Sequence, residues 1–107
     1  MSDQQAKISN AFQIFMTEAP EHAQVWTAAV QGLDQASALD KKTEALAYLA
    51  VLAVLRLESG LPFHVQAAKQ AGASREEVIS AVLVGLLAAG HRVVQALPVV
   101  LAAYEAE

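Results

Sequence analysis

His64 is the side chain in this sequence whose position is best suited to acid–base chemistry. It follows Pro62 by two residues, and proline is favoured in the first turn of an α-helix. The partial positive charge at a helix N-terminus disfavours the imidazolium ion. A neutral imidazole there could accept a proton or polarise a carbonyl group, as histidines do in some enzyme sites. The alternative is a histidine that only hydrogen-bonds a neighbouring backbone carbonyl, and position alone leaves both open.

Two carboxylates are candidates to work with His64 as catalytic partners. Glu44 is expected in the first turns of a helix, just before an apolar run, where desolvation would suit it to act as a base. Glu58 is expected at the end of the same helix, six residues before His64, where the helix dipole disfavours a negative charge. Each also has a simpler interpretation. Glu44 could pair with Lys41 or Lys42 at the surface, and Glu58 could be a solvated loop residue.

Three further side chains are candidates for lining a substrate pocket. Tyr48 lies one helical turn after the first carboxylate, so the two share a helix face. Phe63 is adjacent to His64 in the sequence. His91 stands at an expected helix start, where it could contribute to an anion site. The simpler interpretations are a wall residue for Tyr48 and an exposed helix-start residue for His91.

Several kinds of chemistry are excluded by the residue types and their spacing. The 107 residues contain no cysteine, which excludes disulfides, thiolate nucleophiles and thiolate metal sites. The three histidines are far apart and none has a metal-ligand partner at helical spacing, so we expect no metal. No Gly-rich phosphate loop or Ser/His/Asp pattern is present, so we expect no cofactor. A net charge of −4 with scattered basic residues argues against nucleic-acid binding.

The elements that must position these side chains are all predicted to be helices. The periodicity of apolar residues predicts an all-α fold of about six helices. The expected helices cover residues 3–16, 21–31, 40–57, 62–72, 74–89 and 91–104. Gly32 suits the end of the second helix, and Ser74 and Glu77 have the spacing of a capping box. Pro98 is expected either to kink the last helix or to mark its restart.

The composition predicts a single domain, residues 1–107, that associates with copies of itself. Hydrophobic residues make up 55% of the chain and charged residues 17%. A domain this small cannot bury so much apolar surface alone, so we expect a homo-oligomer. The longest apolar run, residues 45–55, is shorter than the ~20 residues of a membrane span. The N-terminus has no signal-peptide core, and we expect a cytoplasmic protein without membrane or nucleic-acid partners.

An ordered set of residues over the last two thirds of the chain resembles a known family. The set is His64, Ala68, Gly72, Ser74, Glu77, Gly90 and Pro98. This pattern is similar to that of the carboxymuconolactone decarboxylase and alkylhydroperoxidase D-like family, in which Cys-x-x-Cys-x-x-x-His-x-x-x-Ala-x-x-x-Gly precedes a Ser/Thr-x-x-Glu helix start. The resemblance implies antiparallel helices that assemble as a homotrimer or homohexamer.

The sequence departs from the family pattern at the cysteines. Leu57 and Gly60 occupy the two cysteine positions, and neither can form the thiolate that peroxide reduction requires. We therefore reject thiol peroxidase activity. Decarboxylase members also lack the pair, but they tend to carry a carboxylate shortly before the histidine. Here that place holds Gly60, with Glu58 two residues earlier, and the spacing from Glu44 to the motif is one residue longer than expected.

The resemblance implies binding of a small carboxylate or lactone-like metabolite in an apolar pocket at a subunit interface. An enzyme of this kind would be a cofactor-free lyase that decarboxylates or transfers a proton next to a carbonyl. His64 would then be the acid–base group, oriented by Glu44 or Glu58. The alternative is a catalytically silent ligand-binding or scaffold member of the family. A third interpretation, an unrelated helical bundle, would be favoured by a stable monomer.

Overall fold

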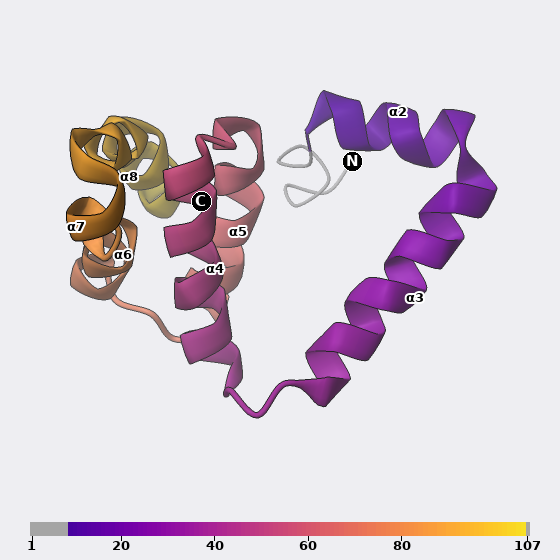
Figure 1. Ribbon diagram of the computed structural model, residues 1–107, viewed down its shortest axis with the longest axis horizontal. Coiled ribbons are helices and arrows are strands. Elements are labelled where there is room, and N and C mark those ends of the chain that lie inside the picture. Colours follow the sequence, from indigo (N-terminus) through magenta and orange to yellow (C-terminus); the bar gives the residue numbers. More distant parts are fainter. Residues whose placement is uncertain (1–8, 107) are drawn as a thin grey trace. The chain divides into compact units, whose positions relative to one another are not determined.

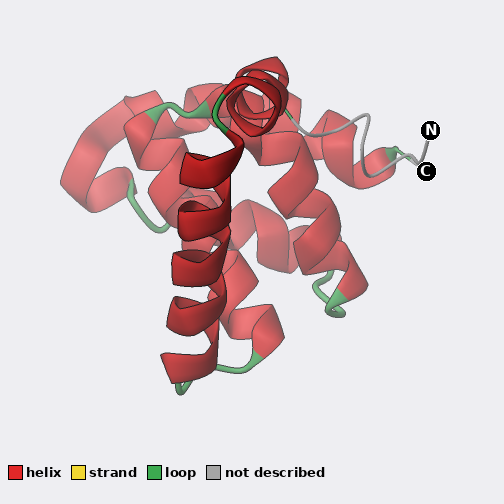
Figure 2. Cartoon of the chain, turned by 90° about the vertical axis from the view of Figure 1, so that its right-hand side faces the viewer, coloured by secondary structure: helices red, strands yellow, loops and turns green. Residues whose placement is uncertain are grey.

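Every regular element in residues 9–106, the part of the chain that this computed structural model describes, is a helix. Figure 2 shows these helices joined by short loops, with no strand in the described part. The helices belong to two units, Met1–Asp40 and Lys41–Glu107. Figure 1 draws the first in indigo and purple and the second in magenta to yellow. The predicted all-α fold is confirmed.

The described part of the first unit contains α2 (Asn10–Glu18) and α3 (Pro20–Ala36), which pack against each other. Ser9 caps α2, because its hydroxyl oxygen accepts a hydrogen bond from the Phe12 amide at 3.2 Å. Serine is favoured at this position since it satisfies an amide that has no partner within the helix. The first predicted helix extends two residues further than expected, and its portion over residues 3–8 lies outside the described residues.

α3 is longer than the sequence pattern predicts. The expected end at Gly32 is wrong, because the helix continues to Ala36 and Ser37 forms its C-cap. The glycines with positive φ in the described residues are Gly72 and Gly90, so Gly32 keeps an ordinary helical conformation. An internal glycine costs only ~1 kcal/mol relative to alanine, which is too little to end a helix of 17 residues.

The second unit contains the apolar core. Its elements are α4 (Lys41–Leu55), the 3₁₀ turn η1 (Glu58–Gly60), α5 (Leu61–Gln70), α6 (Arg75–Leu83), α7 (Leu86–Ala89), the 3₁₀ segment η2 (Gly90–Ala96) and α8 (Leu97–Glu105). Helix α5 packs against α4 and α8, and α6 packs against α4 (Figure 1). The largest fully buried side chains are Leu49, Leu61, Val65, Val78, Val82, Val93 and Val100.

α4 ends two residues before the predicted boundary, in a left-handed C-cap. Arg56 has a φ of 60°, and the Leu57 amide donates to the Leu52 carbonyl oxygen at 3.0 Å. This closure over six residues is the Schellman pattern, which usually places glycine at the left-handed position. Because an arginine takes that place, the sequence has no glycine there that would predict the end of the helix.

The predicted helix over residues 74–89 is two helices in the structure. Its start is confirmed as a capping box: Ser74 Oγ accepts from the Glu77 amide at 3.1 Å, and the Glu77 carboxylate accepts from the Ser74 amide at 2.8 Å. The chain then bends at Gly85, between α6 and α7. A Cβ atom at Gly85 would lie 2.5 Å from Val54 Cγ2 on α4. A larger residue at this bend would therefore force the Val54 side chain or its helix to move.

The last predicted helix begins as a 3₁₀ segment and continues as α8. Gly90 opens η2 with a φ of 76°, a conformation that glycine adopts without strain. Pro98 lies in the first turn of α8. Of the two expectations for this proline, the restart of a helix is confirmed, since the missing amide is not needed in a first turn.

Two side chains of α5 donate hydrogen bonds to the C-terminal end of α8. Gln66 Nε2 donates to the Ala103 carbonyl oxygen at 2.6 Å, and Lys69 Nζ donates to the Tyr104 carbonyl oxygen at 2.7 Å. The last carbonyls of a helix have no intrahelical partners, so these bonds satisfy two of them. The Tyr104 hydroxyl in turn donates to the Ala73 carbonyl oxygen at 3.0 Å. These contacts fix α5, and with it His64, against the rest of the second unit.

The segment Arg75–Glu105 is long and apolar enough, by length and composition alone, to cross a membrane. It is not one straight helix, because it comprises α6, α7, η2 and α8. Both α8 and η2 pack against α6. The segment therefore folds back on itself and contributes to the core of the second unit.

Candidate functional site

His64 lies in the first turns of α5, as its distance from Pro62 predicts. Pro62 occupies the first turn of this helix, and Gly60 stands at the N-cap position without a side-chain cap. His64 is half-buried. Helix α4 packs along α5, so the imidazole sits where a group on α4 can reach it.

Two aromatic rings contact the His64 imidazole. The Tyr48 ring on α4 lies 4.6 Å from it between centroids, with an interplanar angle of 63°. The Phe63 ring lies 5.1 Å away at 78°. Both contacts are edge-to-face, the arrangement that aromatic rings prefer. The structure thus brings together three of the six site residues that the sequence predicts, from two different helices.

Burial lowers the pKa of His64 from its ordinary value of 6.5. The cause is desolvation, which disfavours the charged imidazolium. The partial positive charge at the start of α5 acts in the same direction. His64 is therefore neutral at pH 7, with one ring nitrogen able to donate a hydrogen bond and the other able to accept a proton.

The two predicted carboxylates are not bound to His64. Glu44 lies on α4, half-buried, one turn before Tyr48 and on the same helix face. Glu58 lies in η1, where its Oε1 is 3.7 Å from Arg56 Nε. Among the described residues, no hydrogen bond or ion pair joins either carboxylate to His64. Their catalytic assignment stays a prediction, and Glu44 is the better placed of the two because it shares a face with Tyr48.

His91 is exposed at the start of η2. His64 lies on α5, and the main packing of η2 is against α4, α6, α7 and α8. No ring contact between His91 and His64 occurs within residues 9–106. The assignment of His91 to the substrate pocket is left untested by this geometry and stays a prediction.

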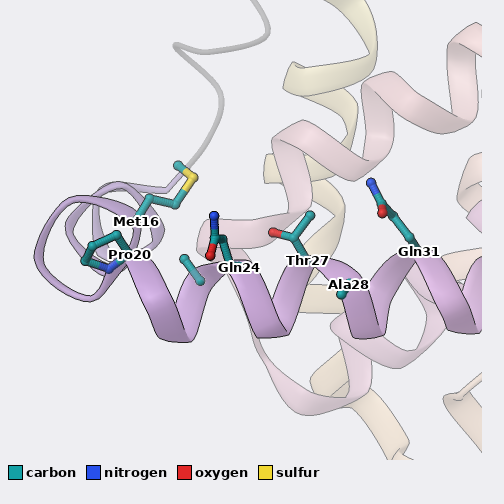
Figure 3. A pocket seen from close by; sticks show the side chains of 7 residues that line it. Met16, Pro20, Gln24, Thr27, Ala28 and Gln31 are labelled. Carbon is teal, nitrogen blue, oxygen red and sulfur yellow. The ribbon is translucent and has the colours of Figure 1, made fainter.

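The surface is also hollowed at two places that the sequence interpretation did not identify. A hollow of about 400 Å³ lies along α2 and α3 and is lined by Met16, Pro20, Ala23, Gln24, Thr27, Ala28 and Gln31. In Figure 3, Gln24, Thr27 and Gln31 extend from the same side of α3. Their spacing of three and four residues is a helical stripe that the sequence could have revealed.

The second hollow, of about 660 Å³, lies between α4 and α6. Its floor consists of small and aliphatic side chains, and its rim carries the ion pair of Lys42 Nζ with Glu77 at 2.9 Å. The small residues Ala47 and Ala50 on α4 are among its lining residues. Neither hollow includes His64, Tyr48 or Phe63.

The side chains of residues 9–106 contain no cluster of three or more His, Asp or Glu residues that could hold a metal ion. The ionisable side chains on the facing parts of α4 and α5 are the Glu44 carboxylate, the Tyr48 phenol and the His64 imidazole. Such groups can hydrogen-bond a carbonyl or carboxylate ligand and move a proton.

Comparison with known proteins agrees with the fold. The model of the carboxymuconolactone decarboxylase family matches residues 20–102. The chain is similar to the crystal structure of an apo carboxymuconolactone decarboxylase family protein from Legionella pneumophila, with 25% sequence identity, a TM-score of 0.78 and coverage of 97% of this chain and 96% of that chain. No curated protein matches.

The family model covers most of the sequence, including the helices that carry Glu44, Tyr48 and His64. The interpretation as an unrelated helical bundle is therefore wrong. This chain, a member without any cysteine, belongs to the carboxymuconolactone decarboxylase family.

Proposed function

We propose that this protein binds a small carboxylate or lactone-like metabolite on the face where Tyr48, Phe63 and His64 meet. The observation that supports this proposal is a half-buried, neutral imidazole in edge-to-face contact with two aromatic rings. A ligand with a short apolar part and one carbonyl or carboxylate group would match such a surface, because binding sites combine apolar walls with a few placed polar groups.

In the enzymatic form of the proposal, His64 transfers a proton or polarises the ligand's carbonyl group. Decarboxylation and proton transfer beside a carbonyl both need an acid–base group in a site that excludes water, and neither needs a nucleophile. Glu44 would orient the imidazole or act as its partner. Tyr48 is 46% exposed, so in this proposal a second copy of the chain covers the site and excludes water from it.

One observation favours the second candidate, a catalytically silent ligand-binding or scaffold protein. Glu58 is paired with Arg56, and in the described residues no carboxylate is hydrogen-bonded to His64. A histidine without an acid–base partner can bind a ligand without turning it over. The two candidates share the site and differ in whether bound ligand reacts.

A thermal-shift screen against small carboxylates, lactones and β-keto acids tests the binding. A ligand that binds only the folded state adds about 2.7 kcal/mol of stability at a hundredfold excess over its Kd. We expect at least one compound to raise the Tm of the wild type and of His22→Ala, a control at an exposed histidine on α3. The same compound should have no effect on His64→Ala.

Release of CO2 or exchange of a carbon-bound proton, measured on the compounds that bind, separates the two candidates. Turnover that is lost in His64→Ala while the oligomeric state is kept would support the enzyme. Binding without turnover would support the silent protein. If no compound binds and His64→Ala melts well below the wild type, His64 is a structural histidine and the proposal is wrong.

A further inference from the structure

An apolar surface with a basic residue at its edge lies where α6, α7 and η2 follow one another. Val84 and Leu86 are 71% and 40% exposed, and Leu87 is fully exposed. Arg92 is exposed in η2, which packs against α7. We call these four residues the α7 surface. The segment 84–92 contains no acidic residue, so its own side chains provide no carboxylate for the arginine.

Arg92 differs from the other basic residues in the described part of the chain, because those are engaged with other groups. The contacts are Lys69 Nζ to the Tyr104 carbonyl oxygen at 2.7 Å, Lys42 Nζ to Glu77 at 2.9 Å, Arg75 Nε to Glu105 at 3.2 Å and Arg56 Nε to Glu58 at 3.7 Å. Lys41 also has an interaction partner. Within residues 9–106, Arg92 belongs to no ion pair. Arginine beside exposed apolar side chains is typical of protein–protein interfaces.

One side of α3 has the complementary properties. Glu21, Val25 and Leu33 are separated by four and eight residues, so they lie on the same side of this helix. All three are exposed, and we call them the α3 face. Neither α2 nor α3 contains a lysine or arginine. In the described residues Glu21 belongs to no ion pair.

We propose that the α3 face of one copy of this chain docks on the α7 surface of a second copy. The aliphatic side chains of the two surfaces are in contact, and Glu21 of one copy pairs with Arg92 of the other. In the single chain both surfaces are exposed to solvent, and burying them against each other removes apolar area from water. The contact needs no ligand, so it does not depend on the proposed function at His64.

The charges favour this pairing over a contact between two identical surfaces. Two α3 faces together would leave Glu21 without a basic partner, because α3 has none to offer. Two α7 surfaces together would leave Arg92 without an acidic partner. Only the contact between unlike surfaces gives both charges a partner. Complementary charges fix the register of an interface and suppress wrong partners.

Cysteine cross-linking tests the contact directly, because the chain has no cysteine of its own. Isotope-labelled Val25→Cys chains are mixed with unlabelled Leu87→Cys chains and treated with a short bismaleimide. Mass spectrometry then identifies the linked peptides. A link between the two variants forms only between copies, and we expect it to exceed the links within each variant. Thr27→Cys is the matched control, because it is exposed and lies on the opposite side of α3 from Val25. It should link to Leu87→Cys much less.

Charge reversal tests the pairing of Glu21 with Arg92. Glu21→Arg and Arg92→Glu should each raise the Kd of association, measured by sedimentation velocity, by about fivefold, the upper range for an exposed ion pair. The variant with both changes should return to the wild-type Kd, because the pair is restored with its signs exchanged. Glu18→Arg makes the same change of charge at an exposed position of α2 and should leave the Kd unchanged.

Several outcomes would overturn the inference. They are links mainly between identical variants, equal linking of Thr27→Cys and Val25→Cys to Leu87→Cys, and no link at all. A chain with both Val25→Cys and Leu87→Cys that closes the link within itself, while the mixture gives none, would show that the two surfaces meet in one chain. Additive losses in the charge-reversal variants would exclude the pairing of Glu21 with Arg92. Each of these results leaves ligand binding at His64 to its own test.

Discussion

The protonation of His64 is set by its neighbours more than by its position in the sequence. A histidine in a first helical turn feels only a modest partial charge, worth about 0.3–1 kcal/mol at an exposed site. The cause of the lowered pKa is burial, which removes water from around the imidazole. The same burial that makes His64 a candidate base also makes its protonation costly to the fold.

The stability of the protein should fall at mildly acidic pH through His64. Its folded-state pKa lies below its unfolded value of 6.5, so between these two values the unfolded chain binds more protons than the folded one. Stability then decreases as the pH falls through this window. Above about pH 6.5 both states are neutral at this residue and the contribution is constant.

Urea unfolding at a series of pH values from about 7 to 5 measures this effect. The wild type should lose more stability over this range than His64→Gln, whose side chain does not titrate. His22→Gln, at an exposed position, should follow the wild type. Parallel pH profiles for the wild type and His64→Gln would show that the imidazole is not desolvated in the folded state.

At the scale of helices, the starts were more predictable than the ends. Three helix starts could be predicted from residues close together in the sequence. They are the capping box of Ser74 and Glu77, the start of α5 at Pro62 and the restart at Pro98. The errors concern Gly32, which a long helix tolerates, and the bend at Gly85, which depends on a contact with α4. A contact between segments that are far apart in the sequence cannot be predicted from the residue pattern of either segment.

The same distinction applies to the candidate site. That His64 lies in the first turns of α5 could be predicted from Pro62, since both are on one helix. That Tyr48 touches the imidazole could not be deduced from periodicity, because it requires the register between α4 and α5. The pairing of Glu58 with Arg56 likewise depends on the left-handed turn after α4, for which the sequence has no glycine signal.

Replacement of Gly85 by alanine should destabilise the second unit. The new Cβ would lie 2.5 Å from Val54 Cγ2 and 3.3 Å from Val93 Cγ1, so these side chains or the elements that carry them must shift. Overpacking of this kind costs about 1–3 kcal/mol, which urea unfolding would measure. Gly60→Ala is the matched control, because nothing lies within 4 Å of its added Cβ. The double variant Gly85→Ala with Val54→Ala should recover part of the lost unfolding free energy. If the losses of the two single variants simply add in the double variant, the clash is disproved.

At the scale of the whole chain, buried and exposed apolar residues are divided unequally between the two units. The core cluster lies entirely in the second unit. In the described part of the first unit, Ala23 alone is buried. Val25 and Leu33 are 72% and 73% exposed. They are eight residues apart on one face of α3. Leu87 in α7 is fully exposed. Apolar surface of this extent usually marks contact sites.

We therefore expect the protein to self-associate through these faces. Sedimentation velocity over about a hundredfold range of concentration should show an oligomer that dissociates on dilution, since association is governed by mass action. Val25→Lys and Leu87→Lys should each shift the protein toward monomer. Gln35→Lys, which places the same charge at an exposed polar position of α3, should leave the distribution unchanged.

The single tryptophan, Trp26, gives an independent measure at the same surface, because it lies on α3 beside Val25. It is 55% exposed, so a second copy that covers α3 would remove it from water. Its fluorescence emission should then shift to shorter wavelength as the protein associates, and this shift should be absent in Val25→Lys. If the wild type sediments as a monomer throughout and its emission never shifts, the apolar face of α3 is not a contact between copies. The proposed site at His64 would then have to work without a second subunit to cover it.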